Sequence, residues 1–252
     1  MSGVSHLAGE APTRDTSAAR PIPGANPGAN PGANPGANPW ELPPTLLRAE
    51  HIEKSFGRRR VLRDVSFSLG AGTLVGIVGE NGTGKSTLLR ILAGELRPRR
   101  GHVEVAGQLG YCPQAVILNE ALTVAQHLNY FRAAYGLTSL DHANALVERL
   151  ALEPYRRDLV GTLSGGTKQK LNLILALMHD PAVLLLDEPY QGFDWETYLR
   201  FWELAEELRA RGRSVLVISH LLFDQQRFDA LYRLHDGRLV DIAPDAASPD
   251  GR

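Results

Sequence analysis

The architecture of this chain follows from one stretch, Gly79-Glu80-Asn81-Gly82-Thr83-Gly84-Lys85-Ser86-Thr87. Before it, residues 73–78 read Thr-Leu-Val-Gly-Ile-Val, a short apolar run with β-branched side chains that predicts a buried strand. After it, residues 88–94 predict a helix that ends at a glycine. A glycine-rich loop therefore joins a strand to a helix, and the rest of the chain is interpreted around it.

This loop fits the pattern G-x-x-x-x-G-K-[ST], which binds phosphate groups when it lies between a strand and a helix. A helix N-terminus offers unpaired N–H groups and a favourable dipole to an anion, and glycines let the backbone curl around it. Lys85 adds positive charge for the β- and γ-phosphates, and Ser86 adds a hydroxyl for Mg²⁺. The loop predicts a nucleotide triphosphatase or a kinase.

The composition fits one sizeable domain and excludes several classes of protein. Of 252 residues, 43% are apolar, which is enough for a packed core. The 27 basic residues nearly balance the 28 acidic ones, so no global charge signature for nucleic acid is present, and Arg58-Arg59-Arg60 is interpreted as solvated loop charge. The one cysteine, Cys112, excludes an internal disulfide and suits a reducing compartment.

The sequence contains no apolar run of the roughly 18–20 residues that a membrane-spanning helix needs. The first residues also lack the apolar segment of a secretory signal. We therefore expect a soluble protein that reaches a membrane only through a partner.

The first 45 residues differ in composition from those that follow. The tetrapeptide Pro-Gly-Ala-Asn recurs four times between Pro23 and Asn38. Proline and glycine at this density prevent helices and strand pairing, so residues 1–45 are expected to form a disordered tail or spacer, with a docking role as the alternative. The folded domain is expected to span residues 46–241, followed by a frayed tail at 242–252.

Strand-like and helix-like segments alternate within residues 46–241. Strands are expected at 47–52, 61–69, 73–78, 102–105, 108–111, 182–186 and 214–218, with a hairpin at 231–240. Helices are expected at 88–94, within a helical inset at 123–158, at 171–178 and at 195–211. This alternation predicts an α/β fold with a parallel-containing sheet, whose ligands bind beyond the carboxyl ends of the strands.

Two acids follow the buried strand at 182–186. Asp187 can hold Mg²⁺ opposite Ser86, and Glu188 can orient or partly deprotonate an attacking water. Two adjacent acids are also compatible with an ordinary turn. The phosphate-binding loop upstream favours the functional interpretation. Ser219 and His220 follow another strand, so three sites distant in sequence are expected to converge.

Several motifs, in this order and spacing, resemble the nucleotide-binding domain of an ABC transporter ATPase. They are residues 79–87, Gln114, Leu163-Ser164-Gly165-Gly166, residues 184–189 and His220. Leu-Ser-Gly-Gly is the most specific, because it separates ABC ATPases from other phosphate-loop proteins. The resemblance covers roughly residues 46–241. It implies a P-loop NTPase core, an antiparallel β subdomain and a helical signature subdomain at about 115–178.

The resemblance also implies ligands and roles. ATP would be bound by Phe56, stacked on adenine, and by Gly79, Glu80, Asn81, Gly82, Thr83, Gly84, Lys85, Ser86 and Thr87. Mg²⁺ would be held by Ser86, Gln114 and Asp187. Glu188 would be the catalytic carboxylate, His220 the switch histidine on the γ-phosphate, and Gln114 a contact of the attacking water.

Two further motifs imply a second protomer. Ser164, Gly165 and Gly166 match the signature that contacts ATP bound to the other copy, and Gly192-Phe193-Asp194 matches the loop that couples the two sites. The sequence departs from the family pattern at Thr167, Gln191 and Phe193, and Phe56 lacks the hydroxyl of the commoner tyrosine. None of these changes removes a catalytic group, so an active site is expected.

These expectations combine into a MgATP-hydrolysing subunit that dimerises on ATP and drives a separate transmembrane permease. It would be cytoplasmic and peripheral on the inner face of the membrane, with no nucleic acid as partner. No sensing domain follows residue 241, which favours an exporter. The alternative is a soluble ABC ATPase acting on nucleic acid or ribosomes. A small-molecule kinase would leave the Leu-Ser-Gly-Gly motif unexplained.

Overall fold

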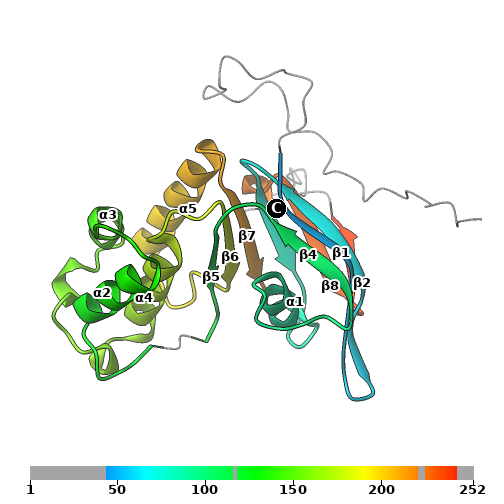
Figure 1. Ribbon diagram of the computed structural model, residues 1–252, viewed down its shortest axis with the longest axis horizontal. Helices are drawn as coiled ribbons and strands as arrows, with labels where there is room; N and C mark the ends of the chain where they lie inside the picture. Colours follow the sequence, from blue (N-terminus) through cyan, green and yellow to red (C-terminus); the bar gives the residue numbers. More distant parts are fainter. Residues whose placement is uncertain (1–43, 116–117, 221–224, 243–252) are drawn as a thin grey trace, which may run out of the picture.

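A mostly parallel sheet forms the centre of the structure (Figure 1). The computed structural model describes residues 44–115, 118–220 and 225–242. The six strands lie in the order β5-β6-β7-β3-β8-β9, and every neighbouring pair is parallel except β8 and β9. Their bounds are β3 Leu74–Val78, β5 Leu109–Cys112, β6 Val183–Asp187, β7 Ser214–Ser219, β8 Ala230–His235 and β9 Arg238–Asp241. The predicted α/β fold with a parallel-containing sheet is confirmed.

A second, antiparallel sheet contains three strands in the order β2-β1-β4. They are β1 (Thr45–Phe56), β2 (Arg59–Gly70) and β4 (Arg100–Val105). The strand β1 is longer than the sequence predicts, because Phe56 still pairs with Arg59. The hairpin turns only at Gly57, whose φ of 58° lies in the left-handed region.

Five α-helices flank the sheets in the described residues. They are α1 (Lys85–Leu92), α2 (Val124–Ala134), α3 (Asp141–Arg149), α4 (Gly165–Leu177) and α5 (Trp195–Ala210). The helices α2, α3 and α4 fall within the region 115–178 that was predicted to be helical. The helix α4 begins at Gly165, earlier than the predicted 171, because Ser164 caps it and accepts the N–H of Thr167.

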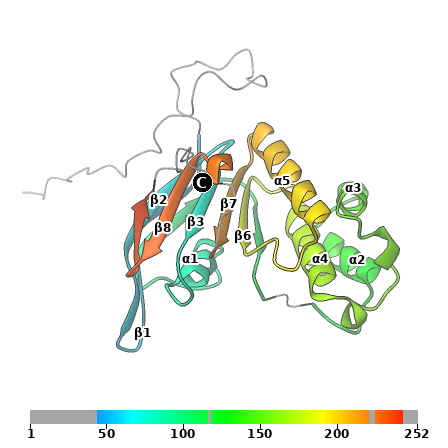
Figure 2. The same cartoon turned by 180° about the vertical axis from the view of Figure 1, so that it is seen from behind.

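The parallel sheet separates two hydrophobic clusters. On β6, Leu184 and Leu186 pack in one cluster with residues of α2, α3, α4 and α5, whereas Val183 and Leu185 pack in the other with α1 and the antiparallel strands. Figures 1 and 2 show the same arrangement from opposite sides, with α1 between the two sheets and α4 beyond the parallel sheet. The helices α1 and α4 therefore lie on opposite faces.

Cys112 ends β5 in the interior of the domain. Its side chain is fully buried, and the Gln169 amide of α4 donates to its Sγ atom at 3.8 Å. Burial raises the pKa of this thiol.

Across the described ranges, no helix is both long enough and apolar enough to cross a membrane. The repeat-containing segment predicted as a tail, up to residue 43, and residues 243–252 lie outside the described residues.

Candidate active site

The predicted site segments lie at one edge of the parallel sheet. The strand β3 leads into the glycine loop, β6 into Glu188, β7 into His220 and β5 into Gln114. The register pairs Val78 with Ser219, Asp187 with Ile218 and Cys112 with Leu186, so the carboxyl ends of the four strands are level. Strand pairing therefore brings segments that are distant in sequence to the same edge of the sheet, as expected.

The loop at 79–87 has the backbone that its glycines permit. Gly82 and Gly84 have φ values of 78° and 110°, which other residues rarely adopt. A Cβ atom on Gly79 would lie 2.6 Å from the carbonyl of Leu234, and one on Gly84 would lie 2.7 Å from Val61. No side chain of the described residues caps the N-terminus of α1, so its first N–H groups fit the phosphates of a nucleotide.

Lys85 lies across the beginning of this loop. Its Nζ atom donates to the carbonyls of Gly79 at 2.6 Å and Glu80 at 3.0 Å. Burial lowers the pKa of this ammonium, and the charges of Glu188 and Asp187 oppose that shift. The two acids therefore help to keep this buried cation charged beside the loop.

Asp187 and Ser86 face each other between β6 and α1. Asp187 is 2% exposed, and burial raises the pKa of its carboxyl although a hydrogen bond from Ser86 acts in the opposite direction. A hydroxyl and a carboxylate in contact provide the oxygen ligands that Mg²⁺ prefers. The residues present therefore fit a magnesium ion bound with the nucleotide.

Glu188 is held by residues that follow β7. Its Oε1 atom accepts from the backbone N–H of His220 at 2.7 Å and from Nδ1 of the His220 ring at 2.8 Å. Its Oε2 atom accepts from the Ser219 hydroxyl at 2.9 Å. Because an ionised carboxylate can only accept, Nδ1 of His220 is the donor in this contact. Glu188 itself has a φ of 50°, a strained value for a residue with a side chain.

Tyr190 joins this network from the loop after β6. Its hydroxyl is hydrogen-bonded to Ser219, and burial raises its pKa to about 12. The sequence placed Ser219 beside His220 at this edge but gave neither Ser219 nor Tyr190 a role. The available signal was their proximity in sequence to His220 and Glu188, respectively.

Gln114 is exposed just beyond β5. The Asn172 amide holds the preceding residue by donating to the carbonyl of Pro113 at 2.9 Å. Within the described residues, the Gln114 amide makes no hydrogen bond to Asp187 or Glu188. Gln114 therefore shares the edge of the sheet with the acids but does not contact them.

Phe56 lies at the end of β1 with 51% of its surface exposed. The adjacent Arg59 donates from Nη2 to the carbonyl of Gly82 at 3.0 Å, so this end of the hairpin lies beside the glycine loop. Arg59 is exposed, as expected of solvated charge, but it begins β2 opposite Phe56 and its guanidinium group reaches the carbonyl of Gly82.

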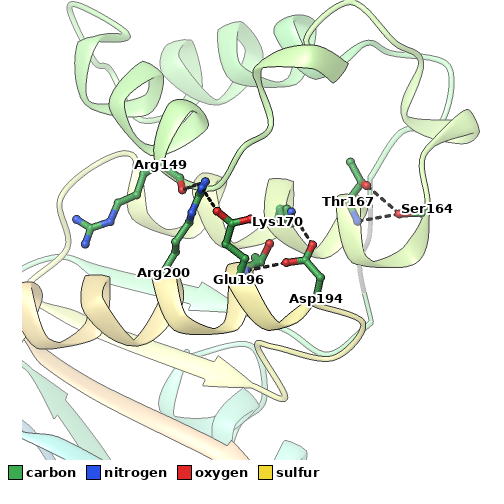
Figure 3. Close-up of polar contacts among 8 residues, drawn as sticks. Arg149, Ser164, Thr167, Lys170, Asp194, Glu196 and Arg200 are labelled. Carbon is green, nitrogen blue, oxygen red and sulfur yellow. Dashed lines mark hydrogen bonds and ion pairs between the residues drawn. The ribbon is translucent and has the colours of Figure 1, made fainter.

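The signature residues begin α4, on the other face of the sheet from α1. The Ser164 hydroxyl accepts the N–H of Thr167 at 3.2 Å and lies 2.8 Å from the hydroxyl of the same residue (Figure 3). A Cβ atom on Gly166 would lie 2.1 Å from the carbonyl of Gly192, so two glycines allow this close approach. Thr167, which departs from the family pattern, is half of the cap.

The same close-up shows how α4 is joined to α5 (Figure 3). Lys170 of α4 lies 3.7 Å from Asp194. Asp194 in turn caps α5 by accepting the N–H of Thr197 at 2.7 Å, and this bond lowers the pKa of its carboxyl. The beginnings of the two helices are therefore linked through both backbone and side chains.

The known sequences that resemble this chain point to one family. The family model described as ABC transporter matches residues 62–191. An uncharacterized ABC transporter ATP-binding protein of Methanocaldococcus jannaschii is 31% identical, over 77% of this chain and 76% of that protein. Nod factor export ATP-binding protein I of Burkholderia lata is 34% identical, over 81% and 73% respectively. A linearmycin resistance ATP-binding protein of Bacillus subtilis is 32% identical, over 78% and 68%.

Solved structures share the fold. The structure described as the ATP binding subunit of an ABC transporter aligns with a TM-score of 0.75 and 29% identity, over 80% of this chain and 91% of that chain. The ADP conformation of an ATP-binding cassette of an ABC transporter aligns with a TM-score of 0.65 and 26% identity, over 78% and 89%.

Proposed function

This chain belongs to the ABC transporter family as an ATP-binding subunit, and we propose that it hydrolyses MgATP to drive a separate transmembrane permease. The observation that carries the proposal is the meeting of the glycine loop, Asp187, Glu188 and His220 at one edge of the parallel sheet. The Nod factor export relative supports the direction of export.

The chain would bind the nucleotide with groups from both sheets. The N–H groups of residues 79–87 and the Lys85 ammonium would hold the phosphates. The exposed ring of Phe56, beside the loop, would stack on the adenine. Ser86 and Asp187, with Gln114 on the same edge, would hold Mg²⁺, which neutralises charge on the phosphate oxygens when bound.

Glu188 would orient the attacking water and partly accept its proton. The carboxylate lies in a buried place, 6% exposed, where its donors Ser219 and His220 restrict its motion. The His220 side chain is 52% exposed, and its Nε2 atom would donate to the γ-phosphate while Nδ1 donates to Glu188. Gln114 would assist at the water from the end of β5.

Two copies would be needed for each complete site. Ser164, Gly165 and Gly166 begin a helix on the opposite face from α1, which supports their use by the ATP of a second copy. The close contact of Gly166 with Gly192, together with the Lys170 and Asp194 pair, would pass a displacement from one site to the other. ATP binding would close the dimer, and hydrolysis would open it.

The dimer would act on the cytoplasmic side of a membrane, bound there through the permease. Balanced charge, with 27 basic and 28 acidic residues, argues against nucleic acid as the partner. Purification from cells tests this partner directly. We expect a multi-span membrane protein to accompany the chain. Recovery with RNA or ribosomes instead would favour the soluble ABC ATPase alternative.

The substitution Glu188→Gln tests the catalytic assignment. It keeps the shape of the side chain but replaces one acceptor oxygen by an amide group and removes the base, so ATP turnover should fall by about 10²-fold or more while ATP binding persists. Size-exclusion chromatography with ATP should then show a dimer that returns to monomer without nucleotide. A Glu188→Gln chain that hydrolyses ATP at the wild-type rate would contradict the assignment.

A further inference from the structure

We infer that Tyr190 and Ser219 are positioning residues for the catalytic carboxylate of Glu188. The inference rests on the function proposed above, because it deepens the role of the same site. The two hydroxyls form a chain that runs from the aromatic cluster on α5 to Oε2 of Glu188.

The acceptor capacity of Glu188 indicates which oxygen is available to water. An ionised carboxylate offers about four lone-pair sites. His220 occupies Oε1 twice, through its backbone N–H and its Nδ1 atom, whereas Ser219 occupies Oε2 once. Among the described residues, these contacts leave one lone pair of Glu188 free, on Oε2. Ser219 donates to the same oxygen that would hold the attacking water, and so fixes the direction in which the free lone pair points.

Tyr190 determines the direction of the Ser219 proton. A serine hydroxyl has one proton and can rotate, so its donor direction depends on its partners. Glu188 can only accept, and the Tyr190 hydroxyl is a second partner of Ser219. When Tyr190 donates to the Ser219 oxygen, the serine proton is left for Glu188. Without Tyr190, the serine hydroxyl could turn away from the carboxylate.

The Tyr190 ring is itself rigidly placed. It packs edge to face against Phe201, with ring centroids 5.8 Å apart, and against Tyr198 at 5.4 Å. Phe201 is 2% exposed and Ser219 is fully buried. Since burial raises the pKa of Tyr190 to about 12, its hydroxyl keeps its proton at neutral pH. The aromatic cluster on α5 therefore supplies a fixed donor at the start of the chain.

These contacts predict an effect on turnover and not on nucleotide affinity. The Ser219 hydroxyl donates to Glu188, whereas Lys85 donates to the carbonyl of Gly79, so removing the Ser219 hydroxyl leaves this contact of Lys85 in place. An imprecisely oriented Glu188 would slow the chemical step alone. The expected signature is a lower kcat at an unchanged KM for ATP.

The test compares the purified full-length variants Ser219→Ala, Tyr190→Phe and their combination in steady-state ATP hydrolysis. Loss of a hydrogen bond to a charged group predicts that Ser219→Ala lowers kcat about tenfold, and Tyr190→Phe about threefold, both at wild-type KM. If Tyr190 acts on Glu188 through Ser219, the double variant should be no slower than Ser219→Ala. Tyr198→Phe is the matched control, since it removes a hydroxyl from the same aromatic cluster away from Glu188, and its kcat should stay unchanged.

Three outcomes would overturn the inference. The first is a wild-type kcat in both single variants. The second is a double variant whose loss of kcat is the product of the two single losses. The third is a rise in the KM for ATP that accounts for the lost activity. Melting temperature and ATP binding are measured on every variant. If Ser219→Ala does not fold, Tyr190→Phe still tests the inference, because it retains the ring packing. If Glu188→Gln still abolishes turnover, the proposed function survives these outcomes. A wild-type chain without ATP hydrolysis would overturn both.

Discussion

Asp187 is the residue at which function and stability oppose each other. Its carboxyl is 2% exposed, and burial raises its pKa more than the hydrogen bond from Ser86 lowers it. Ionised Asp187 therefore destabilises the nucleotide-free fold at neutral pH. The charge is of use only when a cation is bound nearby.

Asp187→Asn should accordingly raise the melting temperature of the nucleotide-free chain at pH 7 and weaken Mg²⁺-dependent ATP binding about tenfold or more. Folding raises the pKa of Asp187. Relative to the variant, the wild type is therefore most stable at pH values below the unfolded-state pKa of Asp187, and it loses that stability as the pH rises through the folded-state pKa. The advantage of the variant should therefore shrink as the pH falls.

Thermal unfolding between pH 5 and 7, paired with nucleotide titrations with and without Mg²⁺, checks both parts of this prediction. Glu196→Gln, at an exposed ion pair on α5, is the matched control and should leave the melting temperature nearly unchanged. A variant at Asp187 that is less stable than the wild type at neutral pH would show that the ionised carboxylate contributes to the fold.

Single residues also show how far sequence reasoning reached. The motifs placed the phosphate loop, Glu188 and His220 at the ends of strands, because alternating elements imply a parallel sheet and such a sheet has one ligand edge. The contacts of Ser219 with Glu188, and of Arg59 with Gly82, could not be predicted in this way. They depend on strand register and hairpin length, which a local pattern does not specify.

At the scale of elements, the beginnings of α4 and α5 act as a pair. Gly166 and Gly192 touch through their backbones, and Lys170 and Asp194 pair beside them. The sequence predicted the apolar part of α4 but placed its start at 171, because residues 164–170 carry no apolar periodicity. The signature was interpreted as a helix N-terminus that contacts a nucleotide, and Ser164 is the residue that caps this helix.

Gly166→Ala should separate these two helix beginnings. Its Cβ would lie 2.1 Å from a backbone carbonyl, which cannot rotate away as a side chain can. We expect a loss of about 1–3 kcal/mol in the free energy of unfolding, the usual cost of overpacking, together with reduced ATP hydrolysis at near-normal ATP binding. Chemical denaturation and ATPase assays provide the measurement.

Gly165→Ala is the matched comparison for stability. A Cβ at that position meets nothing within 4 Å, and alanine favours the helix, so the free energy of unfolding should be unchanged or slightly higher. Equal destabilisation by both substitutions would mean that the approach to Gly192 is not what requires glycine at 166.

At the scale of the whole molecule, the parallel sheet places the two halves of a proposed site on opposite faces. The helix α1 packs in one hydrophobic cluster and α4 in the other. In a symmetric dimer, each site would then combine α1 of one copy with α4 of its partner. The two halves can consequently be inactivated separately.

Lys85→Ala and Ser164→Arg should each be inactive alone but active when mixed. A mixed dimer contains one site in which both the glycine loop and the signature are intact. If half of the dimers are mixed and each has one working site, an equimolar mixture should recover about a quarter of wild-type ATPase activity, or less if the two sites are cooperative. Titrating one inactive variant with the other measures the recovery.

Mixing Lys85→Ala with Glu188→Gln is the control. Both changes lie on the same half of the proposed site, so every mixed dimer has both of its sites broken and should stay inactive. Recovery in this control, or its absence in the first mixture, would contradict a site shared between two copies.

The enclosed position of Cys112 gives this chain an internal reporter. Its thiol lies between β5 and α4 and is the only one in the sequence. A maleimide dye can attach there only after the helical side separates from the sheet, so the labelling rate in native buffer counts opening events. A cysteine introduced on the surface would label at once. Fast labelling would therefore report an introduced surface cysteine, and slow labelling would report spontaneous opening of the domain around Cys112.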